Sequence, residues 1–522
     1  MNEISDITNN LKIIISDNMK TEFGKNHNFD KIKSYADYVK YVPLSDYSDY
    51  RSYIDEMTEK GTNPLTAYSV YCFCKSSGTE GFQKTIPLTE KAINLYGCQI
   101  EKGVMNLYES AKKRAKQGSR FLVNTFRTDL DEPAEKYMLL SEAYYRFLYL
   151  NGYISVDNIV GGKELLFDKK SLDFLYAKVW SAILTKDIIS IEGIFQYDIL
   201  LFFGYLSDSW ERIISDIRRG SIPDNINISE RMKKKLLNMP VSFQRLDYVY
   251  EQCKKGFENI APRLWKNLSF ISGIGYKDSL SENRLLSSFV GNVKKYYFSF
   301  CSSECYSGNA VTTDSFAYEL IKSNGFYEFI EYDCDCPNES TDVVLQSHEL
   351  DVGKTYELVV TNFSGLYRYK TGDILRITDM SGKLPLYEFV RRKNHNLNIA
   401  GEKTNSSHIE YIIKKLSVNF SELISYCFGT IMEEHKGRYI AFISFRTKPH
   451  LQEEKKVSNL LDRLLCEINL DYNDLRILGS VLPLKAIILT ENDYNLQIKR
   501  CFQIIGTINL YIFYRNSRLK CL

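Results

Sequence analysis

The sequence is poor in proline and has almost no excess of charge of either sign. Proline accounts for 11 of the 522 residues, and 67 basic side chains are nearly balanced by 65 acidic ones, giving a formal net charge of +2. Nucleic-acid-binding proteins normally carry a strong basic excess or a basic stripe. Since neither is visible here, we expect no nucleic-acid partner.

Long apolar runs are also missing. The most apolar stretches lie near residues 199–206 and 504–514, and both are far shorter than the ~20 residues that span a bilayer. The N-terminal sequence MNEISDITNN lacks the basic start and apolar stretch of a secretory signal. We therefore expect an intracellular, cytoplasmic, soluble enzyme without a membrane partner.

Metal-ligand patterns are absent as well. The 12 cysteines include no C-x-x-C pair, and the six histidines form no H-E-x-x-H pair, so a zinc site is not expected. Without a secretory signal a disulfide framework is not expected either. We expect free thiols, mostly in the core.

The length of 522 residues predicts two or three domains. Residues 65–74 and 84–87 are predicted as strands, a long helix follows to about residue 117, and the region 134–262 is mostly helical. Strands are predicted at 268–275, 293–301, 356–361, 366–369, 373–378 and 386–391. After residue 394 the pattern alternates between helices (406–416 and 453–469) and strands (424–431, 437–445 and 482–489). The predicted fold is α/β, with a large N-terminal domain (1–393) of β-sheets flanked by helices and a small mobile C-terminal α/β lid domain (394–522).

A polar glycine loop follows the first predicted strand. Ser76, Ser77, Gly78 and Thr79 lead to Lys84. Backbone N–H groups and hydroxyls of such a loop can wrap a polyphosphate, and glycine lets the backbone approach the anion. It is not a Walker loop, because no G-K-[ST] follows. The alternative is an ordinary polar hairpin loop.

A second polar cluster, Ser302-Ser303-Glu304-Cys305-Tyr306, follows the predicted strand 293–301. Open α/β sheets bind ligands at the carboxyl ends of their strands. Glu304 could hold Mg²⁺ against phosphate oxygens. The alternative is a turn without function.

Two further motifs lie near the predicted domain boundary. Gly372-Asp373 opens a predicted strand, where an aspartate can accept hydrogen bonds from both ribose hydroxyls; the alternative is a common β-turn residue. The second motif is the basic run Arg391-Arg392-Lys393-Asn394, which is followed by Gly401, Lys403 and Glu410. Read alone, such a basic run is typical of a solvated face.

The order of these motifs resembles the signature of adenylate-forming enzymes. Within them the chain is similar, almost end to end, to the Gretchen Hagen auxin-responsive family of acyl-acid amido synthetases. The most specific segment is TNFSGLYRY at 361–369 with Gly372-Asp373, and the segments Lys75–Thr79, Leu264–Leu268, Ser302–Tyr306 and Phe389–Asn394 support it.

The resemblance implies a two-step reaction with ATP and Mg²⁺. A carboxylic acid attacks the ATP α-phosphate to give acyl-AMP and pyrophosphate, the small domain rotates, and an amino acid amine then takes the acyl group. The roles that it implies involve the motif residues. Ser76, Ser77 and Thr79 would hold the phosphates, and Gly78 and Ser303 would belong to the same cofactor-binding set. Glu304, a catalytic candidate, would lie near Mg²⁺ and the adenylate, and Asp373 would bind the ribose. Arg392 and the catalytic candidate Lys403 would contact nucleotide or phosphate, and Tyr306 or Tyr369 would stack on adenine.

One segment departs from the family. Members end with a Gln-aromatic-Lys-x-Pro-Arg segment whose lysine reaches the α-phosphate, and the nearest match here is Gln497-Ile498-Lys499-Arg500. Lys499 is therefore the candidate catalytic lysine in an altered setting. An adenylate-forming ligase with another acceptor such as coenzyme A, or a silent nucleotide- or acid-binding relative, remains an alternative. The sequence does not identify the acid or the amine, or the oligomeric state.

Overall fold

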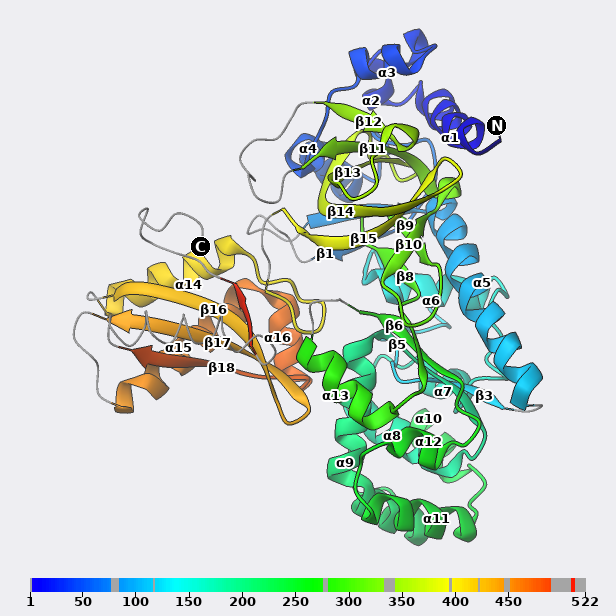
Figure 1. Ribbon diagram of the computed structural model, residues 1–522, viewed down its shortest axis with the longest axis vertical. Coiled ribbons are helices and arrows are strands. Elements are labelled where there is room, and N and C mark those ends of the chain that lie inside the picture. Colours follow the sequence, from blue (N-terminus) through cyan, green and yellow to red (C-terminus); the bar gives the residue numbers. More distant parts are fainter. Residues whose placement is uncertain are drawn as a thin grey trace.

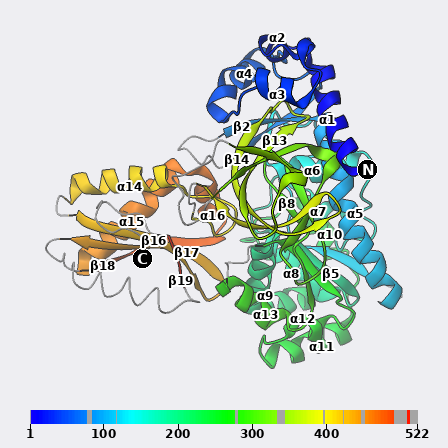
Figure 2. The same cartoon turned by 45° about the horizontal axis from the view of Figure 1, so that its top comes forward.

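A computed structural model describes residues 2–76, 84–115, 118–275, 280–332, 343–393, 397–420, 423–445, 451–489 and 508–511. It has a large N-terminal domain and a smaller C-terminal domain at its side (Figures 1 and 2). Both contain sheets and helices, which confirms the predicted α/β fold. The exact boundary after residue 393 stays a prediction, and residues 394–396 lie outside the described ranges.

The largest sheet of the N-terminal domain is antiparallel. Its order is β12-β11-β13-β14-β15-β10-β9-β8. The bounds are β8 Ser299–Cys301, β9 Tyr306–Ala310, β10 Ala317–Leu320, β11 Gly325–Glu331, β12 Val344–Gln346, β13 Thr355–Asn362, β14 Tyr369–Ser381 and β15 Leu384–Arg392. The helices α1 (Asn2–Asn18), α2 (Glu22–Asn26), α3 (Tyr35–Tyr41) and α4 (Tyr47–Lys60) gather at one end of this domain (Figure 1).

Two smaller sheets complete the N-terminal domain. One joins β2 (Lys84–Thr89), β1 (Val70–Ser76) and β4 (Tyr137–Met138). The other is parallel and joins β3 (Ser119–Leu122), β5 (Ile188–Phe195), β6 (Phe270–Ile274) and β7 (Lys294–Tyr296). The helices around these sheets are α5 Glu90–Ala115, α6 Leu140–Leu150, α7 Gly162–Leu166, α8 Phe174–Leu184, α9 Gln196–Arg219, α10 Glu230–Leu237, α11 Phe243–Lys254, α12 Ile260–Leu264 and α13 Leu280–Val290.

The helix α9, which follows directly on β5 of the parallel sheet, shows why these residues fold as they do. Its apolar residues recur at helical spacing, and Ile199, Phe202 and Leu206 are buried. The helix ends at Gly220, which has φ +66°, a left-handed conformation that suits glycine. Arg218 and Arg219 occupy its last turn, where positive charge interacts favourably with the helix dipole.

Several boundaries differ from the sequence predictions. The predicted strand 293–301 is two strands, β7 and β8, in different sheets. Of the strand predicted at 366–369 only Tyr369 is in a strand, and it opens the long strand β14, which includes the predicted strand 373–378. The region 134–262, predicted as mostly helical, also contains β4 and β5. Gly372-Asp373 therefore lies within β14 and does not open a strand. Gly372 has φ +74°, a conformation that glycine adopts readily, and the strand continues through it.

The C-terminal domain has a sheet of order β18-β17-β16-β19 covered by helices. Its elements are α14 Ser406–Asn419, β16 Leu423–Glu433, β17 Lys436–Phe445, α15 Leu451–Ile468, α16 Leu470–Ile477, β18 Val481–Leu489 and β19 Ile508–Tyr511. The predicted helices and strands are confirmed, whereas α16 and β19 were not predicted. One apolar core includes residues of both domains, so the two domains pack against each other.

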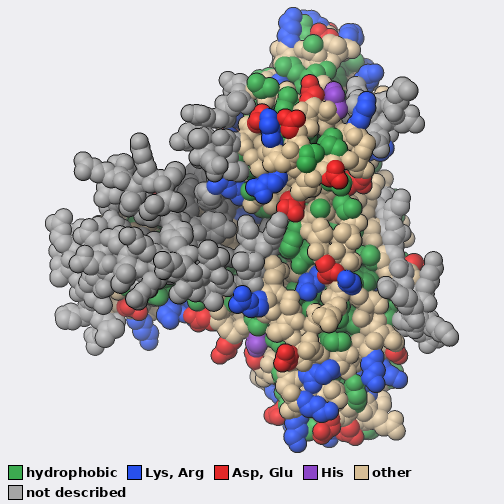
Figure 3. Space-filling view, in the orientation of Figure 1, with side chains coloured by type: hydrophobic (Ala, Val, Ile, Leu, Met, Phe, Trp, Pro, Cys, Tyr) green, Lys and Arg blue, Asp and Glu red, His purple; other side chains and the backbone are tan. Residues whose placement is uncertain are grey.

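The described cysteines agree with the prediction of free thiols. Most of the described cysteines are buried, and all of them are free thiols. Basic and acidic side chains are interspersed on the coloured surface that faces the viewer (Figure 3). None of the described helices is long and apolar enough to cross a membrane.

Candidate active site

The predicted phosphate loop connects β1 to β2. Ser77, Gly78 and Thr79 lie outside the described residues, and Ser76 is described only as the backbone end of β1. Lys84 pairs with Ser76 across the two strands. The buried Lys84 ammonium donates a hydrogen bond to the Tyr369 hydroxyl at 3.3 Å. The residue that follows the loop, Lys84, thus contacts β14.

Glu304 lies in the tight turn between β8 and β9. The Ser302 amide donates to the Cys305 carbonyl at 2.8 Å, which closes the turn. The Asn362 side-chain Nδ2 donates to the Glu304 carbonyl at 2.7 Å, and the Ser303 hydroxyl donates to a Glu304 carboxylate oxygen at 3.0 Å. This turn joins antiparallel strands, so it is not the carboxyl edge of a parallel sheet that the sequence suggested.

Asp373 and Arg392 face each other across β14 and β15. They are register partners, and the Arg392 Nε–Asp373 Oδ1 distance is 2.7 Å. The backbone amide of Asp373 also donates to the Thr371 hydroxyl at 3.1 Å. Two motifs that are 19 residues apart in sequence are therefore brought together by ordinary strand pairing.

Lys403 sits in the short loop before α14. Leu397 and Thr404 pair as an antiparallel bridge and close this loop. The Asn398 carboxamide oxygen accepts hydrogen bonds from the amides of Gly401 at 2.8 Å and Lys403 at 3.4 Å. Lys403 has φ +44°, an uncommon value for a residue with a side chain. The loop thereby presents the lysine in a fixed position.

Electrostatics join these residues into one cluster. Burial alone would raise the pKa of the Glu304 carboxyl, but Arg392, Lys84 and Lys403 outweigh it and hold the pKa at about 2. Burial opposes the charge of Arg392, yet Asp373 and Glu304 raise its pKa above the usual value. The pKa of Lys403 is lowered to about 8, first by the positive charge of Arg392 and then by burial. Glu304 is therefore ionised at neutral pH, and Lys403 is a cation that can lose its proton in mildly alkaline solution.

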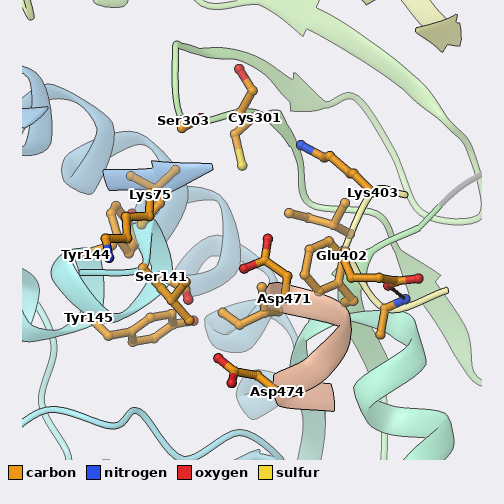
Figure 4. A pocket seen from close by; sticks show the side chains of 18 of the residues that line it. Lys75, Ser141, Tyr144, Tyr145, Cys301, Ser303, Glu402, Lys403, Asp471 and Asp474 are labelled. Carbon is orange, nitrogen blue, oxygen red and sulfur yellow. Dashed lines mark hydrogen bonds between the residues drawn. The ribbon is translucent and has the colours of Figure 1, made fainter. Parts of the chain in front are cut away.

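A cavity of about 370 Å³ opens beside this cluster (Figure 4). Its volume lies in the range of small-molecule sites. The walls are largely apolar and come from both domains, with Phe195 and Tyr145 from the N-terminal domain and, from the C-terminal domain, Leu475 of α16 and Leu478 just after that helix. The remaining lining residues are Lys75, Tyr96, Arg127, Leu139, Leu140, Ser141, Tyr144, Ile194, Ile274, Phe298, Cys301, Ser302, Ser303, Tyr306, Ala400, Gly401, Glu402, Lys403, Asp471 and Asp474.

The structure places the predicted site residues in two groups. Ser303, Tyr306 and Lys403 line the cavity, whereas Asp373 is buried with its partner Arg392. Glu304 is 3% exposed and follows directly on Ser303. The two candidate adenine-stacking residues, Tyr306 and Tyr369, are each 1% exposed and packed against other tyrosines. Lys499 lies outside the described residues. The functional roles of all these residues stay predictions.

Some residues of the site carried no role in the sequence analysis. Lys84 was noted only as the residue after the glycine loop, although it contributes to the charge of the cluster. Arg127, Asp471 and Asp474 line the cavity, and both aspartates project from α16 toward it in Figure 4. No motif surrounds Arg127, and the aspartates lie on a helix that periodicity missed.

The cluster can accommodate a divalent cation only together with a ligand. Among the described residues, no three His, Cys, Asp or Glu side chains come together as a metal site. Mg²⁺ is commonly held by one or two carboxylates plus substrate phosphates. The ionised Glu304, beside three cations that can hold phosphate, fits this kind of site.

Comparisons with known proteins identify the family. The models of the GH3 family N-terminal, central and C-terminal domains match residues 7–278, 318–392 and 407–509. The chain belongs to the GH3 family. This confirms the resemblance found in the sequence motifs.

Curated GH3 relatives match this GH3 chain over most of its length. Indole-3-acetic acid-amido synthetase GH3.4 of Arabidopsis thaliana is 26% identical over 449 residues, covering 82% of this chain and 74% of the relative. Jasmonoyl–L-amino acid synthetase GH3.5 of Oryza sativa subsp. japonica is 23% identical and covers 96% and 90%. The 4-substituted benzoates-glutamate ligase GH3.12 of Arabidopsis thaliana is 23% identical and covers 94% and 90%.

A solved GH3 structure has the same fold. AtGH3.15 acyl acid amido synthetase in complex with 2,4-DB superposes with a TM-score of 0.66 at 21% identity, covering 97% of this chain and 90% of that one. The large and small domains of this GH3 protein thus match an enzyme fold along almost the whole chain.

Proposed function

We propose that this protein is an ATP-dependent, AMP-forming acid–amino acid ligase. In the first step a carboxylate attacks the α-phosphate of ATP, and pyrophosphate leaves. In the second step an amino acid amine attacks the acyl carbon, an amide forms, and AMP leaves. Such chemistry depends on positioning and on charge stabilisation more than on covalent participation of the protein.

The observation that carries the proposal is the buried charge cluster beside an apolar cavity. Two carboxylates, Glu304 and Asp373, and the cations Arg392, Lys84 and Lys403 together leave one positive charge when Lys403 is protonated. A polyphosphate complements that excess, whereas the apolar cavity accepts the organic part of an acid. The carboxylate of the acid then meets the nucleotide where the two regions join.

We assign the nucleotide contacts within this cluster. Asp373 keeps one carboxylate oxygen beyond its bond to Arg392, and it would accept from a ribose hydroxyl. Arg392 and Lys403 would hold phosphate oxygens, and Glu304 would hold Mg²⁺. Bound Mg²⁺ would neutralise charge on the phosphates and polarise them. Ser76, Ser77, Gly78, Thr79 and Ser303 would contribute hydroxyl and backbone donors to the phosphates, and Tyr306 or Tyr369 would lie against the adenine.

The substrates follow from the cavity and the relatives. Walls such as Tyr144, Tyr145 and Phe195 favour an acid with an apolar or aromatic body. Relatives are named for indole-3-acetic acid, jasmonic acid and substituted benzoic acids, and for amino acid acceptors. We propose that this chain also uses a carboxylic acid and an amino acid, and we do not assign a particular acid or amino acid. Lys499 would serve adenylation if the C-terminal domain brings it to the α-phosphate.

Pyrophosphate release tests the proposal. The purified protein is incubated with ATP and Mg²⁺ and a panel of carboxylic acids, with and without mixed amino acids. We expect release that depends on one acid and an amide product that appears with one amino acid, identified by mass spectrometry. A Lys499→Ala variant should lose acid-dependent release.

Other results would redirect the assignment. Acid-dependent release with a thioester product in the presence of coenzyme A would identify a different acceptor. ATP binding without release for any acid would contradict the proposal and identify a binding protein.

A further inference from the structure

The first turn of α9 connects the N-terminal domain to the C-terminal domain through a single hydroxyl. Tyr197 is 3% exposed. Its hydroxyl donates to the Ser480 carbonyl at 2.7 Å and accepts from the Gly437 amide at 2.8 Å. Both partners belong to the C-terminal domain, on the strand β17 and just before β18. One side chain therefore holds two separate segments of the opposite domain.

Close packing surrounds these hydrogen bonds. A Cβ on Gly204 of α9 would lie 2.3 Å from the Cβ of His435, so only glycine lets this helix approach the β16–β17 turn. The rings of Phe289 and His435 lie 5.4 Å apart. In both cartoon views α9 and α13 border the C-terminal domain (Figures 1 and 2). The seam is tightly fitted along these two helices.

Tyr197 and its partner Ser480 each lie two residues from a residue that lines the cavity. Phe195, two residues before it, lines the cavity from the N-terminal domain. Leu478, which directly follows α16 and comes two residues before the bonded Ser480, lines it from the C-terminal domain. Any shift between Tyr197 and Ser480 therefore moves α16 relative to Phe195. The hydroxyl thereby fixes the position of the two cavity walls relative to each other.

We propose that Tyr197 is a positioning residue that holds α16 over the cavity and shields the acyl-adenylate from water. This inference rests on the proposed function, because it concerns the intermediate of that reaction. A closed site that excludes water protects reactive intermediates from hydrolysis. Looser docking of the C-terminal domain would admit water beside the acyl carbon.

The side reaction is hydrolysis of the acyl-adenylate. Water attacks the acyl carbon, and the bond from that carbon to the AMP phosphate oxygen breaks. The free acid and AMP are formed, and the released proton goes to solvent. Pyrophosphate has already left in the first step, so each such event consumes ATP without making an amide.

Tyr197→Phe tests the inference because it removes the hydroxyl and keeps the ring. We expect the ratio of pyrophosphate released to amide formed to rise about fivefold or more, the size expected when one or two hydrogen bonds are lost. Affinity for ATP should not change, since the partners of the Tyr197 hydroxyl, Ser480 and Gly437, are not residues of the charge cluster. The control is Tyr248→Phe, which removes a hydroxyl bonded to the Arg263 carbonyl inside the N-terminal helical layer.

A general loss of stability would lower both products together and leave their ratio unchanged, which would overturn the proposal. Hydrogen–deuterium exchange provides a readout that needs no activity. The Gly437 amide should exchange faster in Tyr197→Phe than in wild type or in Tyr248→Phe, and unchanged exchange would overturn the proposal. If wild type makes no amide with any substrate pair, the proposed function fails, and the exchange result still decides the role of Tyr197 at the seam.

Discussion

Glu304 is 3% exposed, yet its carboxyl group keeps its charge because three cations lie near it. Asp373, also buried, is paired with Arg392 at 2.7 Å. Removing one partner of such a buried pair leaves an uncompensated charge, which is costly. A substitution in this cluster therefore has to keep the shape of the side chain, so that its effect on ATP binding can be separated from its effect on stability.

Asp373→Asn is the variant that best isolates the ribose contact. It keeps an oxygen for Arg392 but removes the negative charge that strengthens acceptance from ribose hydroxyls. We expect ATP affinity measured by calorimetry to fall about tenfold, since a charged hydrogen bond contributes about 1.5 kcal/mol or more. Asp379→Asn, on the exposed end of β14, is the matched control. Unchanged ATP affinity in Asp373→Asn would refute the ribose role.

The pKa of Lys403 predicts that kcat/KM for ATP depends on pH. Because its pKa is about 8, the side chain is a cation below that pH and loses its charge above it. If it binds phosphate, kcat/KM for ATP should decline above about pH 8. Lys403→Arg keeps the charge at all these pH values and should remove the decline, whereas Lys414→Arg on the exposed face of α14 should retain it. An identical alkaline decline in Lys403→Arg would assign it to another group.

At the scale of elements, α8 carries a buried lysine against the parallel sheet. Lys178 is 1% exposed, and its ammonium donates to the carbonyl of Leu122, the last residue of β3, at 2.9 Å. Burial lowers the pKa of this ammonium to about 7. The charge is thus unfavourable in the folded state, and it is tolerated because it satisfies a strand-end carbonyl.

Lys178→Met should stabilise the protein near neutral pH. Between pH 7 and about 10.4 the unfolded chain binds more protons at this position than the folded one, so wild-type stability rises with pH in that window. We expect the free energy of unfolding in urea to increase by about 2 kcal/mol at pH 7, with a smaller gain at pH 9. Lys186→Met, an exposed lysine just after α8, should change it little. A destabilised Lys178→Met would show that the Leu122 contact dominates.

The sequence predicted most elements but not how they join. Alternation and helical spacing located β13, β16, β17, α9 and α15 because each has a clear apolar face. They missed α16, whose eight residues include only a single buried one, Tyr472. Strand pairing is non-local, so neither the antiparallel turn around Glu304 nor the register of Asp373 with Arg392 could be predicted from local pattern. The motifs identified Glu304, Asp373, Arg392 and Lys403, whereas Arg127 had no signal.

For the whole molecule, the apolar core is shared between the domains. It runs from Phe289 and Ile199 in the N-terminal domain to Ile399 and Tyr439 in the C-terminal domain. Interfaces that are apolar and closely packed favour association. Any rotation of the C-terminal domain during turnover must therefore break and remake packed contacts, among them the close approach of Gly204 to His435.

Separate expression of residues 1–393 and 394–522 tests this packing. We expect the two pieces to co-purify when only one carries an affinity tag. Gly204→Leu in the larger piece should abolish co-purification, because the new side chain would occupy the space of His435. Glu211→Leu, on the exposed face of the same helix, is the control. Pieces that separate without any substitution would show that the seam alone does not hold the domains.

Glu304 is synthesised before two of the cations that surround it in the folded protein. Its supporting cations Arg392 and Lys403 follow about 90 residues later in the chain, which corresponds to roughly 5–20 s of translation at ~5–20 residues per second. During that interval the ribosome-bound chain has a carboxylate destined for the interior but only Lys84 to compensate it. The β8–β9 turn therefore has to stay hydrated on the nascent chain until β15 and the loop after it have been synthesised.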